Sequence, residues 1–370
     1  MSRINENTDQ SQDSAFLSDS LLAFECRQAM LRNNFEEPAI EEEWAKFKQN
    51  IDPGHHFTPP VSANRSQKKR YFLLGTAAGV AAVVLVLITF RLYDSYLENR
   101  PVTVFLAQEK KMAITMQLGK TEEVLSDQVK ISDPLAGVSL DSKKADFSKA
   151  KDHTPEMRTI QTSYGKDYVV VLNDGTEVIM NAGSKLTFPT QFEGSERRVS
   201  LEGEAYFRVV KNPKIPFVVK TEKLSTRVYG TEFNVKAYKG GDPHVTLIEG
   251  VVVVDVPNLK KNIKLLPSED VSLKNKTLEI KDIDPQYYIQ WKDGFLYYDN
   301  VALGEVLSDI GRWYNVDIEI EKSSLMAYRM HFVVNRNAGI EEVIENLNEF
   351  KYLHATKIKN KISINDKKNN

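Results

Sequence analysis

The chain has few of the residue types from which catalytic and metal sites are built. Its 370 residues include one cysteine, Cys26, and six histidines. No histidine pair has His-x-x-x-His spacing, and no Cys-x-x-Cys pair is present. A nucleophile elbow and a phosphate-binding loop are also missing from the sequence. We therefore predict no metal, no cofactor and no catalytic residues, and we expect that the protein is not an enzyme.

A strong net charge is missing as well. Lys and Arg number 49 against 51 Asp and Glu, so the formal net charge is −2. A broad nucleic-acid-binding surface needs an excess of positive charge, so the composition argues against a direct nucleic-acid partner. With a single cysteine the chain cannot form an internal disulfide. Its domains must be stabilised by burial and hydrogen bonding, which requires substantial cores.

One long apolar run is present, Tyr71–Phe90, and no charged side chain interrupts it. At about 1.5 Å rise per helical residue, such a run spans the roughly 30 Å hydrocarbon core of a bilayer. A cleaved signal peptide is a poorer interpretation, because the run starts far from the amino terminus and exceeds a signal h-region in length. A buried core helix is the other alternative. We predict a transmembrane helix at residues 71–90.

The flanks of this run predict its orientation. The amino-terminal flank is basic, with Arg65, Lys68, Lys69 and Arg70. The other flank is mixed, with Arg91, Asp94, Glu98 and Arg100. The positive-inside rule then places residues 1–70 in the cytoplasm and residues 91–370 outside it. The predicted localisation is the inner membrane, with a single pass, a cytoplasmic amino terminus and a periplasmic carboxyl terminus.

The cytoplasmic segment, residues 1–64, carries two short amphipathic helix patterns. The apolar stripes are formed by Leu17, Leu21, Phe24 and Leu31 in the first helix and by Ile40, Trp44, Phe47 and Ile51 in the second. Two helices this short cannot bury both stripes well against each other. Two interpretations remain open: a loose helical hairpin, or a clamp whose apolar faces are completed by a cytoplasmic partner.

The outer portion is predicted to contain a spacer, an all-β domain, a linker and a small α/β domain. Residues 91–157 lack clear periodicity and are interpreted as a spacer. Residues 158–256 hold short alternating strands separated by turn signals, among them Asn173-Asp174-Gly175 between two β-branched runs. This pattern predicts an all-β unit but does not choose between a sandwich, a jelly roll and a solenoid. Residues 257–292 are interpreted as a linker.

The last segment, residues 293–366, alternates between strand and helix patterns. Two helical faces are expected, one over Leu303–Tyr314 and one over Ile340–Leu347. Strand patterns precede and follow each of them, and a hairpin closes the segment. The order β-α-β, β-α-β predicts a small two-layer α/β domain.

Six motifs between Leu172 and Leu296 resemble the signature of FecR-type proteins, and they occur in the same order. They are Leu172-Asn173-Asp174-Gly175-Thr176-Glu177-Val178 with Asn181 and Ser184–Pro189; Leu201-Glu202-Gly203-Glu204-Ala205-Tyr206-Phe207-Arg208-Val209; Pro216–Val219; Val228-Tyr229-Gly230-Thr231-Glu232-Phe233-Asn234-Val235; Leu247–Val253; and Trp291–Leu296. The resemblance covers Thr159 to Asn365. The final segment is similar to the secretin and TonB short N-terminal domain of Bacteroidetes-type relatives, with Arg312-Trp313-Tyr314-Asn315-Val316 as its R-W-Y-N-V element.

The motif residues also have a structural explanation. The glycines supply turns or bulges, and Asn181 and Asn234 are expected to bond backbone groups at strand ends. In the alternation of residues 198–209, Glu204 is expected on the face opposite to Phe207. The motifs are therefore interpreted mainly as maintaining the fold.

The resemblance implies an inner-membrane anti-sigma factor. Such proteins hold an extracytoplasmic-function sigma factor on the cytoplasmic side and sense the signalling domain of a TonB-dependent outer-membrane transporter on the periplasmic side. In many members release proceeds by stepwise proteolysis, with envelope and intramembrane proteases as further partners. On this basis we predict a sigma-binding surface formed by Leu17, Leu21, Phe24, Leu31, Ile40, Trp44 and Phe47. We also predict a contact of Trp313 and Tyr314 with the transporter's signalling domain.

Two rival functions belong to other classes. One is a membrane-anchored binding module for glycan or an envelope scaffold, for which the aromatic pairs Tyr287-Tyr288 and Tyr297-Tyr298 are candidates. The other is an envelope enzyme, for which the sequence offers no motif.

Overall fold

The computed structural model describes residues 84–96, 100–108, 113–118, 121–125, 137–151 and 155–367. The predicted cytoplasmic segment and most of the predicted transmembrane run lie outside these residues. Residues 84–96 are helical, and large apolar side chains such as Leu87 and Phe90 are exposed on this helix. Among the described residues, no helix is both long enough and apolar enough to cross a membrane. The membrane span at residues 71–90 stays a prediction.

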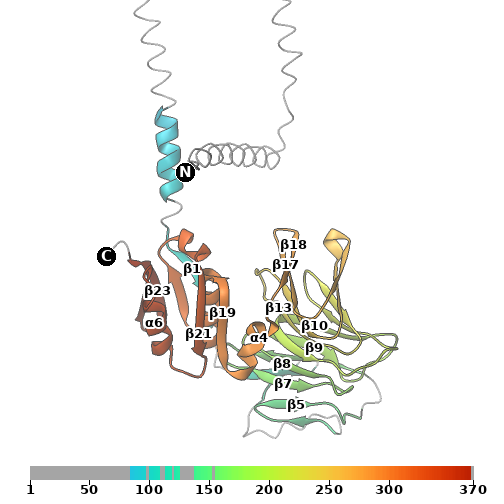
Figure 1. Ribbon diagram of the computed structural model, residues 1–370. Helices are drawn as coiled ribbons and strands as arrows, with labels where there is room; N and C mark the ends of the chain where they lie inside the picture. Colours follow the sequence, from blue (N-terminus) through green and yellow to red (C-terminus); the bar gives the residue numbers. More distant parts are fainter. Residues whose placement is uncertain are drawn as a thin grey trace, which may run out of the picture. The chain divides into compact units, whose positions relative to one another are not determined.

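Strands β2 to β18 form an all-β domain of two sheets that share the long strand β10 (Figure 1). The first sheet has the order β3 (Thr121–Leu125), β2 (Ile114–Leu118), β6 (Met157–Thr162), β9 (Lys185–Pro189), β10 (Arg197–Arg208), β11 (Phe217–Lys220), β12 (Ser225–Val228), β15 (Val252–Val256) and β16 (Lys261–Leu265). The second has the order β4 (Ser139–Leu140), β5 (Lys144–Asp146), β7 (Tyr168–Val171), β8 (Glu177–Met180), β10, β13 (Glu232–Ala237), β14 (His244–Glu249), β17 (Glu269–Lys274) and β18 (Thr277–Asp282).

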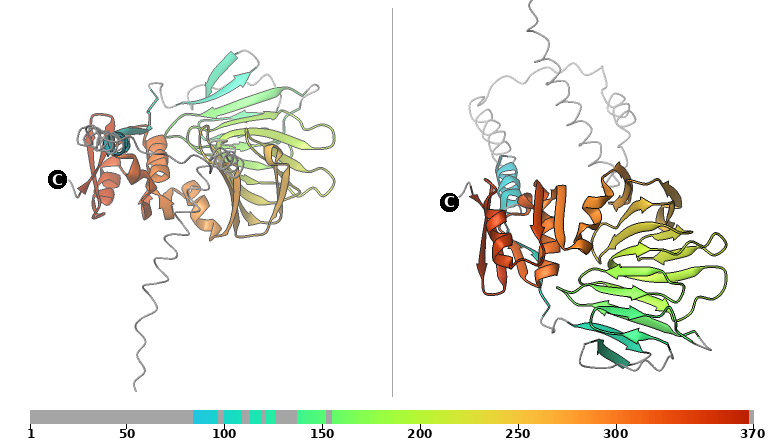
Figure 2. Two further views of the ribbon diagram at one scale, coloured as in Figure 1. Left: turned by 90° about the horizontal axis from the view of Figure 1, so that it is seen from above. Right: turned by 60° about the horizontal axis from the view of Figure 1, so that its bottom comes forward.

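The chain passes back and forth between these sheets, commonly after two strands. Strands β11 and β12 belong to the first sheet, β13 and β14 to the second, β15 and β16 to the first, and β17 and β18 to the second. Figure 2 shows the strands stacked in chain order along the domain, from green near residue 140 to gold near residue 280. The predicted all-β unit is confirmed, and its winding is solenoid-like.

Strand β10 changes sheets at Gly203. Residues Ser200–Glu202 pair with β9 of the first sheet, whereas Gly203–Arg208 pair with β13 of the second. The backbone of Gly203 has a φ of 107°, and a Cβ atom there would lie 2.5 Å from Ser184 Oγ. Glycine is required because both the left-handed backbone and the close approach exclude a side chain.

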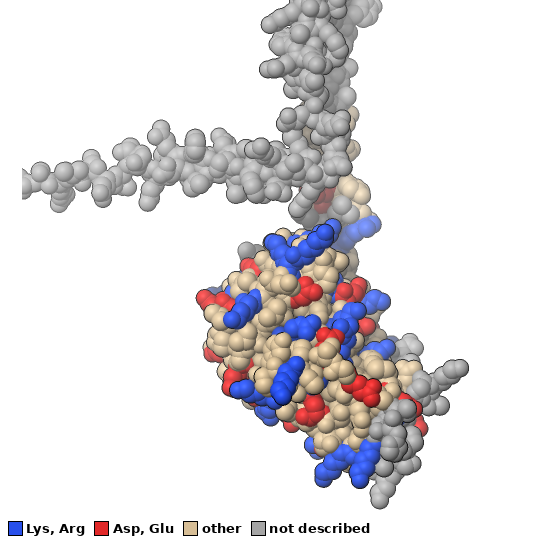
Figure 3. All heavy atoms as spheres, turned by 90° about the vertical axis from the view of Figure 1, so that its right-hand side faces the viewer, with Lys and Arg blue, Asp and Glu red and all other residues tan. Residues whose placement is uncertain are grey.

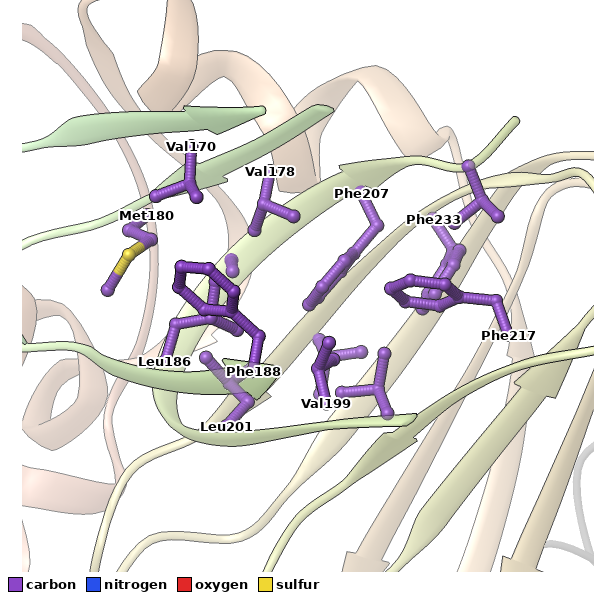
Figure 4. Packing of buried hydrophobic residues seen from close by; sticks show 14 of the residues in the cluster. Val170, Val178, Met180, Leu186, Phe188, Val199, Leu201, Phe207, Phe217 and Phe233 are labelled. Atoms are coloured by element: carbon purple, nitrogen blue, oxygen red, sulfur yellow. The ribbon is translucent and has the colours of Figure 1, made fainter. Parts of the chain in front are cut away.

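The two sheets close around one apolar core. Val178, Phe207 and Phe233 of the second sheet face Phe188 and Phe217 of the first (Figure 4). The rings of Phe207 and Phe233 are stacked, with centroids 5.1 Å apart. All five side chains are completely buried. Because burial of a large apolar side chain stabilises by about 1.5–3 kcal/mol, this core replaces the disulfides that the chain cannot form.

The structure corrects two of the predicted domain boundaries. Residues 91–157, interpreted as a spacer, contain β1 (Val102–Phe105) and strands β2 to β5. Residues 257–292, interpreted as a linker, contain the 3-10 helix η1 (Pro257–Leu259), strands β16 to β18, helix α4 (Pro285–Ile289) and the 3-10 helix η2 (Gln290–Asp293). Both errors have one cause: these strands are short or rich in charged residues, so their apolar alternation is weak, and pairing with neighbouring strands stabilises them.

The carboxy-terminal domain has the predicted order of elements but its strands fall into two separate sheets. The elements are β19 (Phe295–Ala302), α5 (Leu303–Tyr314), β20 (Asp317–Ile320), the 3-10 helix η3 (Ser323–Ala327), β21 (Arg329–Asn335), α6 (Ile340–Asn348), β22 (Leu353–Ile358) and β23 (Lys361–Asp366). β19 pairs with β21, and β20, β23 and β22 form the second sheet. One core joins both sheets and both helices, which corrects the predicted two-layer arrangement.

The fourth strand of that second sheet comes from the other end of the described chain. β1 pairs antiparallel with β20 and so occupies the β20 edge. Phe105 at the end of β1 packs on helix α5 at Gly311, where a Cβ atom would lie 2.5 Å from the ring. A segment that follows the helix of residues 84–96 is thus built into the last domain of the chain.

We expect Gly203→Ala to lower the free energy of unfolding by about 2 kcal/mol or more, because it adds a clash with Ser184 to the strain of a left-handed backbone. The matched control is Gly194→Ala, since Gly194 also has a positive φ but nothing lies within 4 Å of its Cβ position. The control should cost about 1 kcal/mol. Chemical denaturation followed by circular dichroism measures both, and equal losses would contradict the close-approach explanation.

Candidate functional site

Glu204 of the Leu201–Val209 motif is buried, contrary to its predicted position on an exposed face. Its side chain accepts hydrogen bonds from Asn181 Nδ2 at 2.8 Å and from Asn234 Nδ2 at 2.9 Å. The expectation that these asparagines bond backbone groups is confirmed for Asn181, whose Oδ1 accepts from the Ala182 amide at 2.8 Å. For Asn234 it is wrong, because its Nδ2 donates to Glu204 and its Oδ1 has no partner among the described residues. Only 6% of Glu204 is exposed. The reason is tertiary: the second sheet is covered on its outer face by α4, η2 and the carboxy-terminal domain.

Burial shifts the pKa of this carboxyl group. Removal from water raises the pKa of Glu204, and the nearby ammonium group of Lys236 and the two asparagine amides oppose that shift only in part. The carboxyl group is thus biased toward its neutral form relative to an exposed glutamate.

A half-buried ion network joins the β domain to helix α5. Lys236 Nζ, on β13, donates to Glu305 Oε1 and Asp309 Oδ2, both at 2.8 Å. Arg312 Nη1 donates to Asp309 Oδ1 at 2.5 Å. Burial alone would lower the pKa of Lys236, but the Asp309 and Glu305 carboxylates outweigh it and raise that pKa well above its usual value. The ammonium group in turn lowers the pKa of Glu305 to about 2.

Cation–aromatic contacts reinforce the same junction. The guanidinium group of Arg312 lies 3.6 Å from the ring centroid of Tyr238 in the β domain. Arg336 lies 3.8 Å from the ring centroid of Trp313 and forms an ion pair with Asp167 of the β domain. Such contacts add attraction where water is excluded, so the two domains are joined by paired charges as well as by the chain.

The segment between the two domains also packs on the second sheet. Ile289 of α4 and Trp291 of η2 form a small apolar cluster with Tyr206 of β10. Asp284 caps α4 by accepting a hydrogen bond from the Gln286 amide at 3.0 Å. Among the described residues, the buried Trp291 Nε1 and Asn234 Oδ1 have no hydrogen-bond partner.

These elements enclose a cavity of about 440 Å³. Its walls come from β10, β13 and β14 on one side and from α4, β19 and α5 on the other. The lining includes Lys236 and Glu305 of the ion network and the aromatic residues Tyr287, Tyr288 and Trp291. The volume lies in the range of about 300–1,000 Å³ that small-molecule sites occupy, which makes this cavity the candidate site.

Only two of the predicted site residues, Trp313 and Tyr314, lie within the described part of the chain. Leu17, Leu21, Phe24, Leu31, Ile40, Trp44 and Phe47 lie outside the described residues. Trp313 is half-buried, lines the cavity, and its indole N–H donates to the Arg336 carbonyl at 2.5 Å. Tyr314 packs against the core of the carboxy-terminal domain. Contact of these two residues with a transporter domain stays a prediction.

Sequence reasoning missed the residues of the ion network. Lys236 and Glu305 are separated by 69 positions, and nothing in the spacing of either indicates a partner. The Asp309–Arg312 pair stands at i, i+3 on a predicted helix, which is the one local signal that a sequence search could use.

Comparison with known proteins finds two matching family models and similar solved structures. The chain matches the family described as FecR protein over residues 158–253 and the family described as FecR, C-terminal over residues 295–364. Crystal structures of a proposed anti-sigma factor from Parabacteroides distasonis ATCC 8503, at 1.65 and 2.50 Å resolution, are similar to it. The first is 30% identical, with a TM-score of 0.53 over 56% of this chain and 97% of that one. The second is 29% identical, with a TM-score of 0.54 over 57% and 99% of the two chains.

Curated proteins give no match. The family matches follow the all-β domain and the carboxy-terminal domain in chain order, and the solved relatives are covered almost completely. The chain belongs to the FecR family.

The ion network should make the stability of the two joined domains depend on pH in the acidic range. Because the pKa of Glu305 is lowered from 4.5 to about 2 in the folded state, its contribution is complete above pH 4.5 and is lost as the pH falls toward 2. We expect Glu305→Gln to reduce the loss of stability between pH 5 and pH 2. The Glu305 side chain is 41% exposed, so solvent screening limits the difference to about 1 kcal/mol.

The denaturation midpoint, measured across that pH interval, tests this expectation. Glu202→Gln is the matched control, because Glu202 is exposed on β10. The control should follow the unmodified protein, and parallel pH curves for all three proteins would show that Glu305 does not carry the dependence.

Proposed function

We propose that the protein is a single-pass inner-membrane anti-sigma factor. Residues 1–64 hold an extracytoplasmic-function sigma factor in the cytoplasm, residues 71–90 cross the membrane, and the two outer domains receive a signal from a TonB-dependent outer-membrane transporter. Membership in the FecR family supports this proposal most directly, together with the solved relatives that are described as a proposed anti-sigma factor. Reporter fusions at residues 64 and 100 that localise to one compartment would defeat it.

The described part of the predicted anchor supports a membrane role. Residues 84–90 expose the side chains of Val84, Leu85, Val86, Leu87, Ile88 and Phe90 to solvent. Exposed apolar side chains in an unbroken run are costly in water, because their hydration is unfavourable. A lipid environment removes this cost, in agreement with a membrane segment that ends near residue 90.

The outer domains are suited to relay and not to catalysis. The basic groups of the cavity are engaged with carboxylates, as Lys236 is with Glu305 and Asp309 in the ion network. β1 lies a few residues beyond the helix of residues 84–96 and is built into the sheet of the carboxy-terminal domain. A partner that displaces or strains this domain therefore acts on a strand close to the proposed anchor.

We place the proposed docking of the transporter's signalling domain on the β19–β21 sheet. Addition of a partner strand at β20 is blocked, because β1 already pairs there. On the β19–β21 pair, Phe295 and Val333 are exposed, and Val333 stands directly opposite Tyr297. An exposed apolar surface on a two-stranded sheet suits strand addition with apolar anchors. Trp313 and Tyr314 remain a proposed secondary contact.

The face drawn in Figure 3 carries charges of both signs. Lys and Arg side chains alternate there with Asp and Glu side chains over the visible surface. Interspersed charges produce no strong field of one sign, so we expect recognition on that face to depend on shape and apolar contact more than on long-range steering.

Val333→Glu should reduce capture of the signalling domain by the outer portion at least tenfold, because it introduces a charge that must be desolvated in the proposed interface. Val333 is 51% exposed, so the cost to folding is small. Ile358→Glu is the matched control, since Ile358 is 70% exposed on β22 of the other sheet. Pull-down with the purified signalling domain measures both, and equal effects of the two changes would exclude this surface.

Trp44→Ala should weaken capture of the sigma factor about 30-fold, which corresponds to the roughly 2 kcal/mol that a central aromatic anchor contributes to an interface. Trp44→Phe should keep most of the affinity, and Lys46→Ala, off the apolar stripe, should leave it unchanged. Co-purification of full-length variants with the sigma factor provides the measurement. Full capture by Trp44→Ala would remove Trp44 from the proposed binding surface.

A further inference from the structure

The interdomain cavity has a feature that the proposed sigma regulation does not use, an aromatic wall. Tyr287, Tyr288 and Trp291 line it from α4 and η2, and Tyr297 lines it from β19. Tyr287 and Tyr297 are stacked, with ring centroids 4.2 Å apart and an interplanar angle of 19°. Aromatic faces offer a flat surface to the C–H faces of a ligand, and the tyrosine hydroxyl groups add polar contacts at the ring edges.

The floor of the cavity carries balanced charge. The positive groups of Lys236 and Arg312 are paired with the carboxylates of Glu305 and Asp309. Burial raises the pKa of Glu204, which biases this carboxyl group toward its neutral form. At the floor an anion meets the two carboxylates and a cation meets the two basic groups, so neither sign is favoured there. Asp282, Asp284 and Asp299 also line the cavity, but they are exposed to solvent, which screens their charge.

The lining offers hydrogen-bond donors and acceptors together. Glu305 and Asp309 present carboxylate oxygens, Lys236 presents an ammonium group, and Tyr288 presents a hydroxyl group that makes no hydrogen bond within the described residues. A ligand hydroxyl group both donates and accepts, so one kind of group can satisfy every member of this set.

We infer that this cavity binds a neutral sugar of one or two rings. The volume of about 440 Å³, the aromatic wall, the balanced floor and the mixture of donors and acceptors all suit a polyhydroxylated ligand without charge. The site is independent of sigma binding. Its walls belong to both outer domains, so an occupying sugar bridges β13 of the β domain and α5 of the carboxy-terminal domain.

The inference also accounts for the aromatic pairs that the sequence offers as glycan-binding candidates. Tyr287, Tyr288, Tyr297 and Tyr298 all line the cavity. Tyr298 is buried, and the other three are half-buried, so these residues form a cavity wall and not an open platform.

Saturation-transfer NMR and calorimetry on the full chain, in a detergent without a sugar headgroup, test the inference. The probes are D-glucose, D-galactose, N-acetyl-D-glucosamine, maltose, cellobiose and lactose. D-Glucosamine and D-glucuronate serve as cationic and anionic counterparts of the same ring. We expect saturable binding of at least one neutral sugar and at least tenfold weaker binding of its charged counterparts. Absence of binding by every neutral probe, or preference for a charged probe, overturns the inference.

Variants distinguish the cavity from adventitious binding. Tyr287→Ala should weaken the binding of the neutral sugar at least tenfold, and Tyr288→Phe, which removes one hydroxyl group, should weaken it several-fold without a change in fold. Tyr229→Ala is the matched control, because Tyr229 is 49% exposed and does not line the cavity. Unchanged affinity in both cavity variants, or equal losses in all three proteins, would refute the site. A normal circular dichroism spectrum is required of each variant.

Discussion

The pairing of one half-buried lysine with two carboxylates of another domain holds the β domain and the carboxy-terminal domain together. Lys236 stands on β13 and its carboxylate partners Glu305 and Asp309 stand on α5. A buried ammonium group is costly unless it is paired, so each domain carries charges that require the other. The same groups form the floor of the cavity. Packing between the domains, the shape of the cavity and its electrostatic balance therefore depend on a single network.

The second constraint is the path of the chain. β1 and the carboxy-terminal domain are separated by most of the described sequence, and yet β1 completes the sheet formed by β20, β23 and β22. Phe105 of β1 fits against α5 because position 311 is a glycine. Helix α5 thus contacts both the strand nearest to the proposed anchor and the lysine of the β domain. A force or a ligand that moves α5 reaches both, which gives the proposed relay a physical route in this protein.

Much of the architecture was predictable from the sequence, because the residues of the apolar patterns are the ones that the fold buries. The alternation of Val199 and Leu201 predicted a half-buried strand, and both are buried on β10. Leu303, Val306 and Ile310 predicted the buried face of α5. The pattern failed for Glu204, whose alternating position indicates exposure. At Gly203 the strand moves into the second sheet, and the outer face of that sheet is covered by segments far away in the sequence.

The amino-acid sequence by itself determined the strands and helices with strong apolar periodicity, the family, and the absence of an internal disulfide, because these depend on residue type and near-neighbour spacing. Tertiary structure alone decided that residues 102–105 join the last domain, that weakly patterned residues 257–292 are part of the fold, and that the aromatic pairs surround a cavity. Strand pairing and charge pairing act between residues that are close in space and remote in sequence. No local pattern records such partners, so only the folded chain brings Lys236, Glu305 and Tyr287 to the same site.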